Sequence, residues 1–180
     1  EYNGCKRWLV LPGLVDLHVH ASQFAYRGTG MDVELLDWLN ACAFPEESRF
    51  ADLDYAARAY GRFVEDVVRG PNTRACVFAT AHVEATLLLM DMLEKSGLVT
   101  MVGKVSMDTS APDGLREPDA PSAARAVRSW LEAAQGRYER TQPMLTPRFI
   151  PSCSDALLRE LGAIQRESGL PVQSHLSENR

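Results

Sequence analysis

The sequence has few cysteines and no long apolar run, and both shortages narrow the class of protein. The four cysteines are widely spaced and form no C-x-x-C motif, which argues against a disulfide framework and favours reduced thiols. No run approaches the roughly 18 apolar residues of a membrane span, and no basic and then apolar leader is recognisable. We therefore expect a cytoplasmic protein with no membrane partner.

A strong excess of charge of one sign is also lacking. The chain carries 19 lysines and arginines against 24 acidic residues, for a formal net charge of -5, and the two signs are interleaved. This balance argues against nucleic acid as a partner and favours a neutral small molecule. With 180 residues, 46% of them hydrophobic, the chain can form one sizeable core but not two comfortable domains.

Strand-like and helical patterns alternate along the chain. Apolar, β-rich runs lie at residues 14–20, 75–78, 99–105, 143–146 and 170–174, and helical periodicity is clearest at 52–69 and 157–164. Residues 108–122 are predicted to form a surface loop. Gly70, Gly97, Gly136 and Gly169 follow helical stretches, as left-handed caps do. The alternation predicts a parallel sheet, either open or a (β/α) barrel; the absence of G-x-G-x-x-G after any strand favours the barrel.

His18 and His20 are the first candidates for chemistry. They lie two residues apart on a predicted strand, so both side chains point to the same face and could share one metal ion. An isolated H-x-H pair is a weak signal, because most such histidines lie at the surface or are hydrogen-bonded.

Further candidates follow later strands. His175 would supply a third nitrogen ligand, and Glu178 could move a proton to or from a metal-bound water; the alternative is an ordinary polar loop. Arg148 and Phe149 could bind the edge and face of a flat ligand, or could be a surface arginine beside a core phenylalanine. Gln23 offers one donor group and one acceptor. The carboxyl ends of parallel barrel strands share one face, so these clusters are expected to converge.

The motifs together resemble a known family. Residues 12–20 (PGLVDLHVH) resemble the first-strand signature of the amidohydrolase superfamily, and residues 20–23 (HASQ) narrow the resemblance to guanine deaminases. The segments DWL (37–39), FPEE (44–47), FAT (78–80), GKV (103–105), TPRF (146–149) and SHLSENR (174–180) resemble that family in order and spacing. The resemblance implies hydrolytic deamination of guanine to xanthine and ammonia by a zinc-activated water.

The resemblance also implies roles for individual residues. His18, His20 and His175 would bind zinc, and Glu178 would be the catalytic proton shuttle. The substrate-binding set would be His20, Ala21, Ser22, Gln23, Arg148, Phe149, His175 and Glu178. Family members with two metals have a lysine at the end of the fourth strand; TPRF stands there, so one zinc ion per subunit is implied, and Lys104 is predicted to be structural. The family resemblance further suggests a homodimer.

The extent of the chain sets two further expectations. The family places another metal histidine after its sixth strand and a catalytic aspartate after its eighth, and neither strand is present in this sequence. We therefore expect residues 12–180 to form an incomplete barrel of about five strands, preceded by an atypical lead-in at 1–11. Two alternatives remain open, namely an amidohydrolase acting on another heterocycle and a catalytically incomplete fragment.

Overall fold

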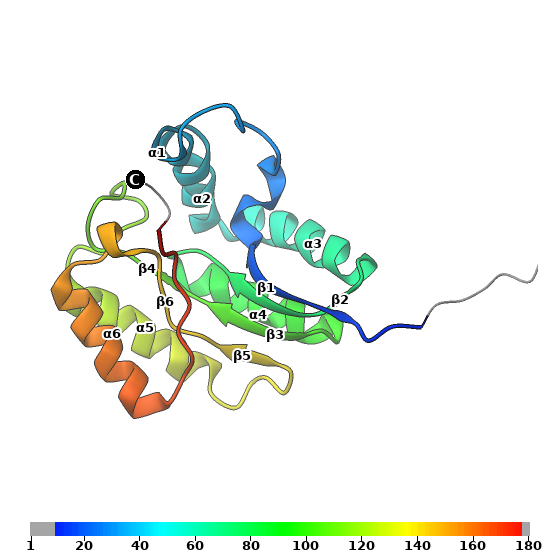
Figure 1. The fold of residues 1–180 in the computed structure, drawn as a ribbon. Helices are drawn as coiled ribbons and strands as arrows, with labels where there is room; N and C mark the ends of the chain where they lie inside the picture. The colour runs from blue at the N-terminus through cyan, green and yellow to red at the C-terminus, as the bar shows by residue number, and fades with distance from the viewer. Residues whose placement is uncertain (1–9, 178–180) are drawn as a thin grey trace, which may run out of the picture.

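Four parallel strands form the central sheet of the chain (Figure 1). The computed structural model describes residues 10–177. The sheet has the order β1-β2-β3-β5, with bounds β1 Leu14–His20, β2 Asn72–Phe78, β3 Val99–Gly103 and β5 Thr141–Pro143. A second, two-stranded parallel sheet pairs β4 (Val105–Ser106) with β6 (Thr146–Pro147). Parallel pairing with helical crossovers is the predicted arrangement, and it is confirmed.

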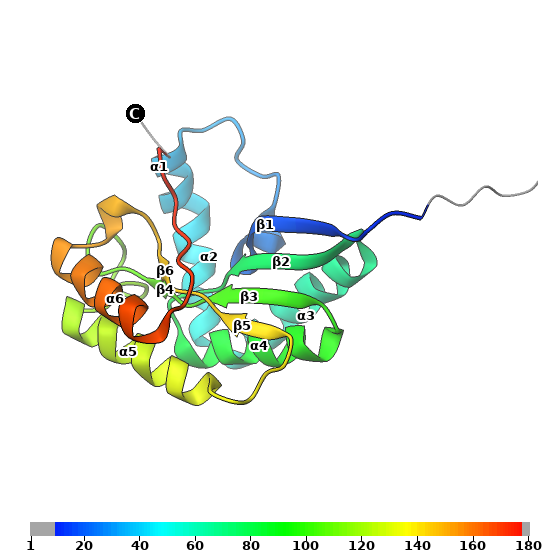
Figure 2. The same cartoon turned by 60° about the horizontal axis from the view of Figure 1, so that its bottom comes forward.

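Long helices connect the strands and cover one face of the sheet (Figure 2). They are α3 (Leu53–Arg69), α4 (Val83–Ser96), α5 (Ala120–Ala134) and α6 (Asp155–Ser168). A compact helical segment between β1 and α3 comprises α1 (Leu35–Trp38), a π-helical turn (Leu39–Ala43) and α2 (Phe44–Ser48), with 3-10 turns at Ala21–Tyr26 and Arg49–Ala51. A further 3-10 turn, Ile150–Ser152, follows β6. The core forms where the helices bury their apolar faces against Val77 and Val102 of the sheet.

The glycine caps are confirmed at three of the four predicted positions. Gly97 and Gly169 end α4 and α6 with φ of 81° and 69°, and Gly136 has φ of 70° just after α5. The prediction for Gly70 is wrong, because this residue is extended with φ of -81°. Pro71 follows it, and a residue before proline is pushed out of helical conformations toward the extended region.

Two predicted strands differ in detail from the structure. The run at 99–105 is split at Lys104 into β3 and β4, and the run at 143–146 is split into β5 and β6. The run at 170–174 forms no continuous strand. It is held beside β6 by single bridges, Leu145 to Val172 and Phe149 to His175 (Figure 1). The Pro171 carbonyl accepts from the Leu145 N–H, but Pro171 has no N–H to donate, so the pairing does not extend before the Val172 bridge.

The loop predicted at residues 108–122 also contributes to the interior. Leu115 is buried in a small second cluster with Phe44, Phe78 and Val105, which lies beneath the carboxyl ends of the strands. Glu117 forms an ion pair with the buried Lys104. This loop is therefore packed against the rest of the chain rather than lying only at the surface.

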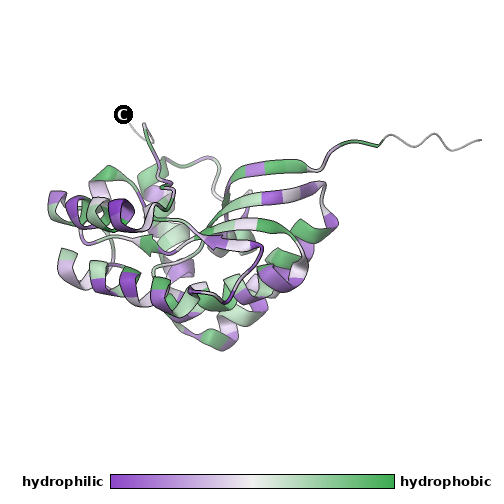
Figure 3. Ribbon diagram, turned by 90° about the horizontal axis from the view of Figure 1, so that it is seen from below, coloured by the Kyte–Doolittle hydropathy of each residue, from purple (hydrophilic) through white to green (hydrophobic). Residues whose placement is uncertain are grey.

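One edge of the sheet carries exposed apolar side chains. Leu14, Val15 and Leu17 on β1 are at least half exposed, and Figure 3 shows green, hydrophobic stretches along this strand. A barrel that is not closed presents such an edge, so the prediction of a partial barrel is confirmed by the sheet order and this exposure. Among residues 10–177, no helix has the length and apolar character needed to span a membrane.

Gly103 provides a test of the packing between β3 and the last segment. A Cβ at this position would collide with the Thr146 side chain and approach Gln173 Nε2, two groups joined by a 2.9 Å hydrogen bond. Gly103→Ala is expected to lower the free energy of unfolding by about 1–3 kcal/mol, through overpacking. Urea unfolding measures this. Gly61→Ala is the matched control, because its Cβ meets nothing within 4 Å and alanine favours a helix; equal stability of the two variants would contradict the packing.

Candidate metal and ligand site

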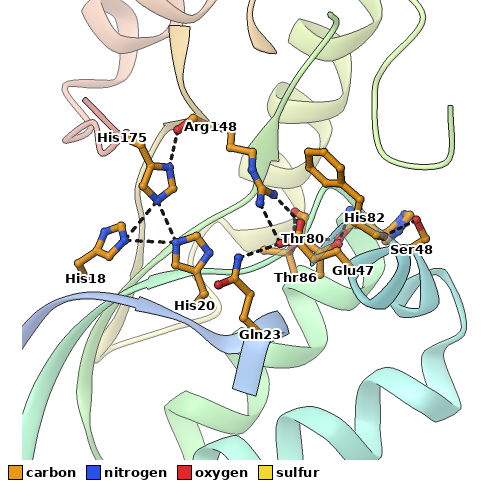
Figure 4. A network of polar contacts seen from close by, with 11 residues as sticks. His18, His20, Gln23, Glu47, Ser48, Thr80, His82, Thr86, Arg148 and His175 are labelled. Atoms are coloured by element: carbon orange, nitrogen blue, oxygen red, sulfur yellow. Dashed lines mark hydrogen bonds and ion pairs between the residues drawn. The ribbon is translucent and has the colours of Figure 1, made fainter. Parts of the chain in front are cut away.

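Three histidine side chains converge at the carboxyl end of β1. The Nε2 atom of His20 lies 3.2 Å from His18 Nε2 and 3.0 Å from His175 Nε2, and the latter two atoms lie 3.2 Å apart (Figure 4). The period of the strand places His18 and His20 on the same side, and the Phe149 to His175 bridge brings the third ring across from residue 175. The predicted convergence of these residues is therefore present.

The hydrogen bonding of His175 determines which of its nitrogens faces the cluster. Its Nδ1 lies 2.8 Å from the Arg148 carbonyl oxygen, which can only accept, so Nδ1 carries the proton. Its Nε2 therefore presents a lone pair to the other two rings. Metal-binding histidines commonly use a backbone carbonyl in this way to fix their tautomer and orientation.

The surroundings of His20 favour its neutral form. Burial, followed by the positive charge of Arg148 and the neighbouring rings of His175 and His18, holds the pKa of His20 well below its usual value. A neutral imidazole is the form that binds metal. Three nitrogens at such short mutual distances are suited to a shared cation.

The spacing of the nitrogens fits a divalent metal. Nitrogen ligands at about 2.0–2.1 Å from a tetrahedral zinc ion would lie roughly 3.3 Å apart, and the observed separations are close to this value. Phe78 supports all three rings. It stacks on His20 with centroids 4.5 Å apart and contacts His18 and His175 at 5.0 and 4.6 Å. The three histidines therefore have both the chemistry and the arrangement of a metal site.

Phe78 was not predicted as part of the site. It ends β2 directly opposite His20 in the sheet register, so a prediction of strand pairing would have found it. Its side chain is fully buried, which fixes the plane against which the imidazoles pack.

Arg148 is buried, contrary to the alternative of a surface arginine. Its side chain is 3% exposed and forms a bidentate ion pair with Glu47, which is 1% exposed; Nη1 lies 2.5 Å from Oε2 and Nη2 lies 3.1 Å from Oε1. Gln23 Nε2 donates to the same Oε1 at 3.2 Å. The structure thus joins Arg148 and Gln23 through Glu47, a residue that the sequence did not single out for chemistry.

A cavity of about 610 Å³ opens beside His175. Apolar residues of α1, the π-helical turn and the 3-10 turn after β6 form most of its wall, among them Leu35, Leu39 and Phe149. A flat, partly apolar ligand could be enclosed here; Phe149 and His175 line the cavity, whereas Arg148 and Gln23 do not. Ala21 and Ser22 are buried at the end of β1.

Two other predicted residues stand apart from this arrangement. Glu178 lies outside the described residues. Lys104 is 1% exposed, and its ammonium donates to the Val105 carbonyl at 2.9 Å and pairs with Glu117. These partners support the predicted structural role of Lys104.

A parallel α/β fold with a histidine cluster at its carboxyl edge is the arrangement typical of metal-dependent enzymes of the barrel type. A family model described as "Amidohydrolase family" matches residues 9–180, so the chain belongs to the amidohydrolase family.

Within this family, the sequence of the chain is similar to proteins named guanine deaminase. The chain is 43% identical to human guanine deaminase over 172 residues, covering 94% of this chain and 38% of that protein. The guanine deaminase of Escherichia coli is 31% identical, with 96% of this chain and 39% of that protein covered. The chain therefore spans less than half the length of these relatives.

A solved structure gives the same similarity in three dimensions. The crystal structure of guanine deaminase from C. acetobutylicum, with bound guanine in the active site, superposes with a TM-score of 0.89 at 45% identity, covering 93% of this chain and 40% of that one. The resemblance to guanine deaminases inferred from the motifs is thus confirmed.

Proposed function

We propose that the protein containing this chain removes the amino group of guanine by hydrolysis, giving xanthine and ammonia. The observation that carries the proposal is the convergence of three imidazole nitrogens able to bind a metal with Arg148 and Gln23 at one edge of the sheet. The similarity to the guanine-bound C. acetobutylicum structure supports guanine as the substrate.

The metal proposed is a single zinc ion held by His18, His20 and His175. When bound, zinc lowers the pKa of a coordinated water toward neutrality and so supplies a nucleophile. His175 couples the two halves of the site, because its Nδ1–H donates to the backbone carbonyl of Arg148. The residue proposed to bind the purine therefore also orients a proposed metal ligand.

The proposed ligand contacts follow from the chemistry of the side chains. Arg148 donates to an acceptor of the purine, Gln23 accepts from a neighbouring N–H, and Phe149 packs on the ring face. His20, Ala21 and Ser22 lead from the proposed metal to Gln23, and together with His175 they complete the proposed substrate-binding set. Glu178 remains a proposed proton shuttle for the attacking water and the ring nitrogen.

The location, the partners and the domain bounds of the protein stay predictions. The protein is proposed to be a cytoplasmic homodimer, to have no nucleic acid partner, and to use residues 12–180 as one incomplete barrel domain with 1–11 as a lead-in. The 180-residue chain by itself is expected to show little or no deaminase activity, because the family's later metal histidine and catalytic aspartate are not among its residues.

A turnover assay tests the proposed reaction. The longest expressed protein that contains this sequence is loaded with zinc and incubated with guanine, adenine, cytosine and a triazine. We expect equal amounts of xanthine and ammonia from guanine, with the other heterocycles turned over far more slowly, and loss of turnover after chelation. Faster hydrolysis of another heterocycle would instead identify an amidohydrolase of different specificity.

A further inference from the structure

We propose that Glu47 is a positioning residue that sets the hydrogen-bonding polarity of the purine site. This inference rests on the proposed function and deepens it. By accepting from both Gln23 and Arg148, Glu47 determines which groups these two residues can present to a ligand.

Glu47 is held firmly in place. It lies on α2 (Phe44–Ser48) and is 1% exposed, and its carboxylate accepts from the side chains of Gln23 and Arg148 (Figure 4). The Arg148 guanidinium also lies over the Phe44 ring, 5.1 Å from its centroid. The carboxylate and its partner are therefore fixed from several sides before any ligand enters.

The carboxylate decides the orientation of the Gln23 amide. A carboxylate paired with arginine is ionised and can only accept hydrogen bonds. Gln23 must therefore turn its NH₂ group toward Glu47 Oε1, which leaves its own Oε1 as the acceptor for a ligand. Without this carboxylate, the Gln23 amide could present either its oxygen or its NH₂ group to a ligand.

The same carboxylate places donors beside that acceptor. The bidentate pair uses two of the five N–H groups of Arg148. Because Arg148 Nη2 and Gln23 Nε2 both contact Glu47 Oε1, the two side chains end side by side. The site consequently presents an acceptor next to a donor, which is complementary to a ligand edge such as N1–H and O6 of guanine. 2,6-Diaminopurine reverses this edge, since it has a ring acceptor beside an amino donor.

A purely structural ion pair is the alternative to this role. Buried ion pairs contribute little net stability compared with apolar residues of similar volume, because of the cost of desolvation. An apolar pair could fill the same space, but it could not fix the Gln23 amide. The property that separates the two roles is therefore the preference of the site for the guanine edge over the 2,6-diaminopurine edge. A purely structural ion pair would leave this preference unchanged when it is altered.

Glu47→Gln tests this directly in the longest expressed, zinc-loaded protein that contains the sequence. The new amide can donate to Gln23 Oε1, so Gln23 is expected to turn and present NH₂ to the ligand. The ratio of kcat/KM for guanine to that for 2,6-diaminopurine should fall at least about tenfold, mainly through a higher KM for guanine. Glu117→Gln is the matched control, because it breaks the pair with buried Lys104 without contacting the ligand residues, and it should leave the ratio unchanged.

Several outcomes would overturn the inference. A folded Glu47→Gln variant with an unchanged ratio, or an equal fall in Glu117→Gln, contradicts it. If Glu47→Gln does not fold, Glu47→Asp keeps the charge for Arg148 but withdraws from Gln23, and its ratio should also fall. The preference for guanine over 2,6-diaminopurine is also measured without turnover, as the ratio of the two equilibrium dissociation constants. Absence of turnover in the unsubstituted protein therefore contradicts only the proposed reaction, while an unchanged binding ratio contradicts the role of Glu47.

Discussion

Arg148→Met is expected to lower the free energy of unfolding by about 3–5 kcal/mol, because the substitution leaves the Glu47 carboxylate buried and without its charge partner. It should also abolish measurable guanine binding. Urea unfolding and equilibrium binding measure the two effects separately. A variant as stable as the unsubstituted protein would show that the buried pair carries no such energy.

The double variant Arg148→Met and Glu47→Leu separates stability from ligand binding. Removing both charges replaces the ion pair with apolar side chains of similar size, so most of the lost stability should return. Guanine binding should stay lost, because neither a donor at 148 nor a fixed amide at Gln23 remains. Recovery of guanine binding in the double variant would contradict the role of these residues in recognition.

His175→Ala is the second change with a large expected effect. It removes one of three converging nitrogens, and zinc affinity should fall on the order of 100-fold or more, since changes to outer-shell partners alone typically cost 10–100-fold. Competition with a chromogenic chelator measures the affinity.

The fourth histidine of the chain provides the control for that change. His82 is the N-cap residue of α4 and is not a member of the converging triad. His82→Ala should therefore bind one zinc ion with nearly unchanged affinity. Equal zinc loss in His82→Ala and His175→Ala would mean that the triad is not the metal site.

Local sequence patterns predicted the histidines of the site, because their positions depend on strand geometry. His18 and His20 were found from the two-residue period of a strand, and the convergence of His175 and Arg148 on them was expected because parallel strands end at one edge. The alternation of helices and strands likewise predicted the parallel sheet. Roles carried by the family resemblance, including that of Glu178, remain predictions.

Residues whose role depends on tertiary contacts were missed. Glu47 lies 24 residues from Gln23 and 101 from Arg148, and no period or motif chemistry links these positions. Its only local signal was its place in FPEE, where two acidic residues follow Phe44 and Pro45. The extended conformation of Gly70 was missed because the following proline outweighs the glycine's capping preference, and the interruption at Pro171 was missed for a similar backbone reason.

The central claim is that three imidazoles hold one metal beside a purine-binding edge fixed by Glu47. A crystal structure of the zinc-loaded protein with guanine, with anomalous scattering recorded at the zinc edge, tests it most directly. We expect one anomalous peak about 2.0–2.1 Å from Nε2 of His18, His20 and His175, with Arg148 donating to the purine and Gln23 Oε1 accepting from it. Zinc bound elsewhere, or a purine that contacts the Gln23 amide through its nitrogen, would contradict the account.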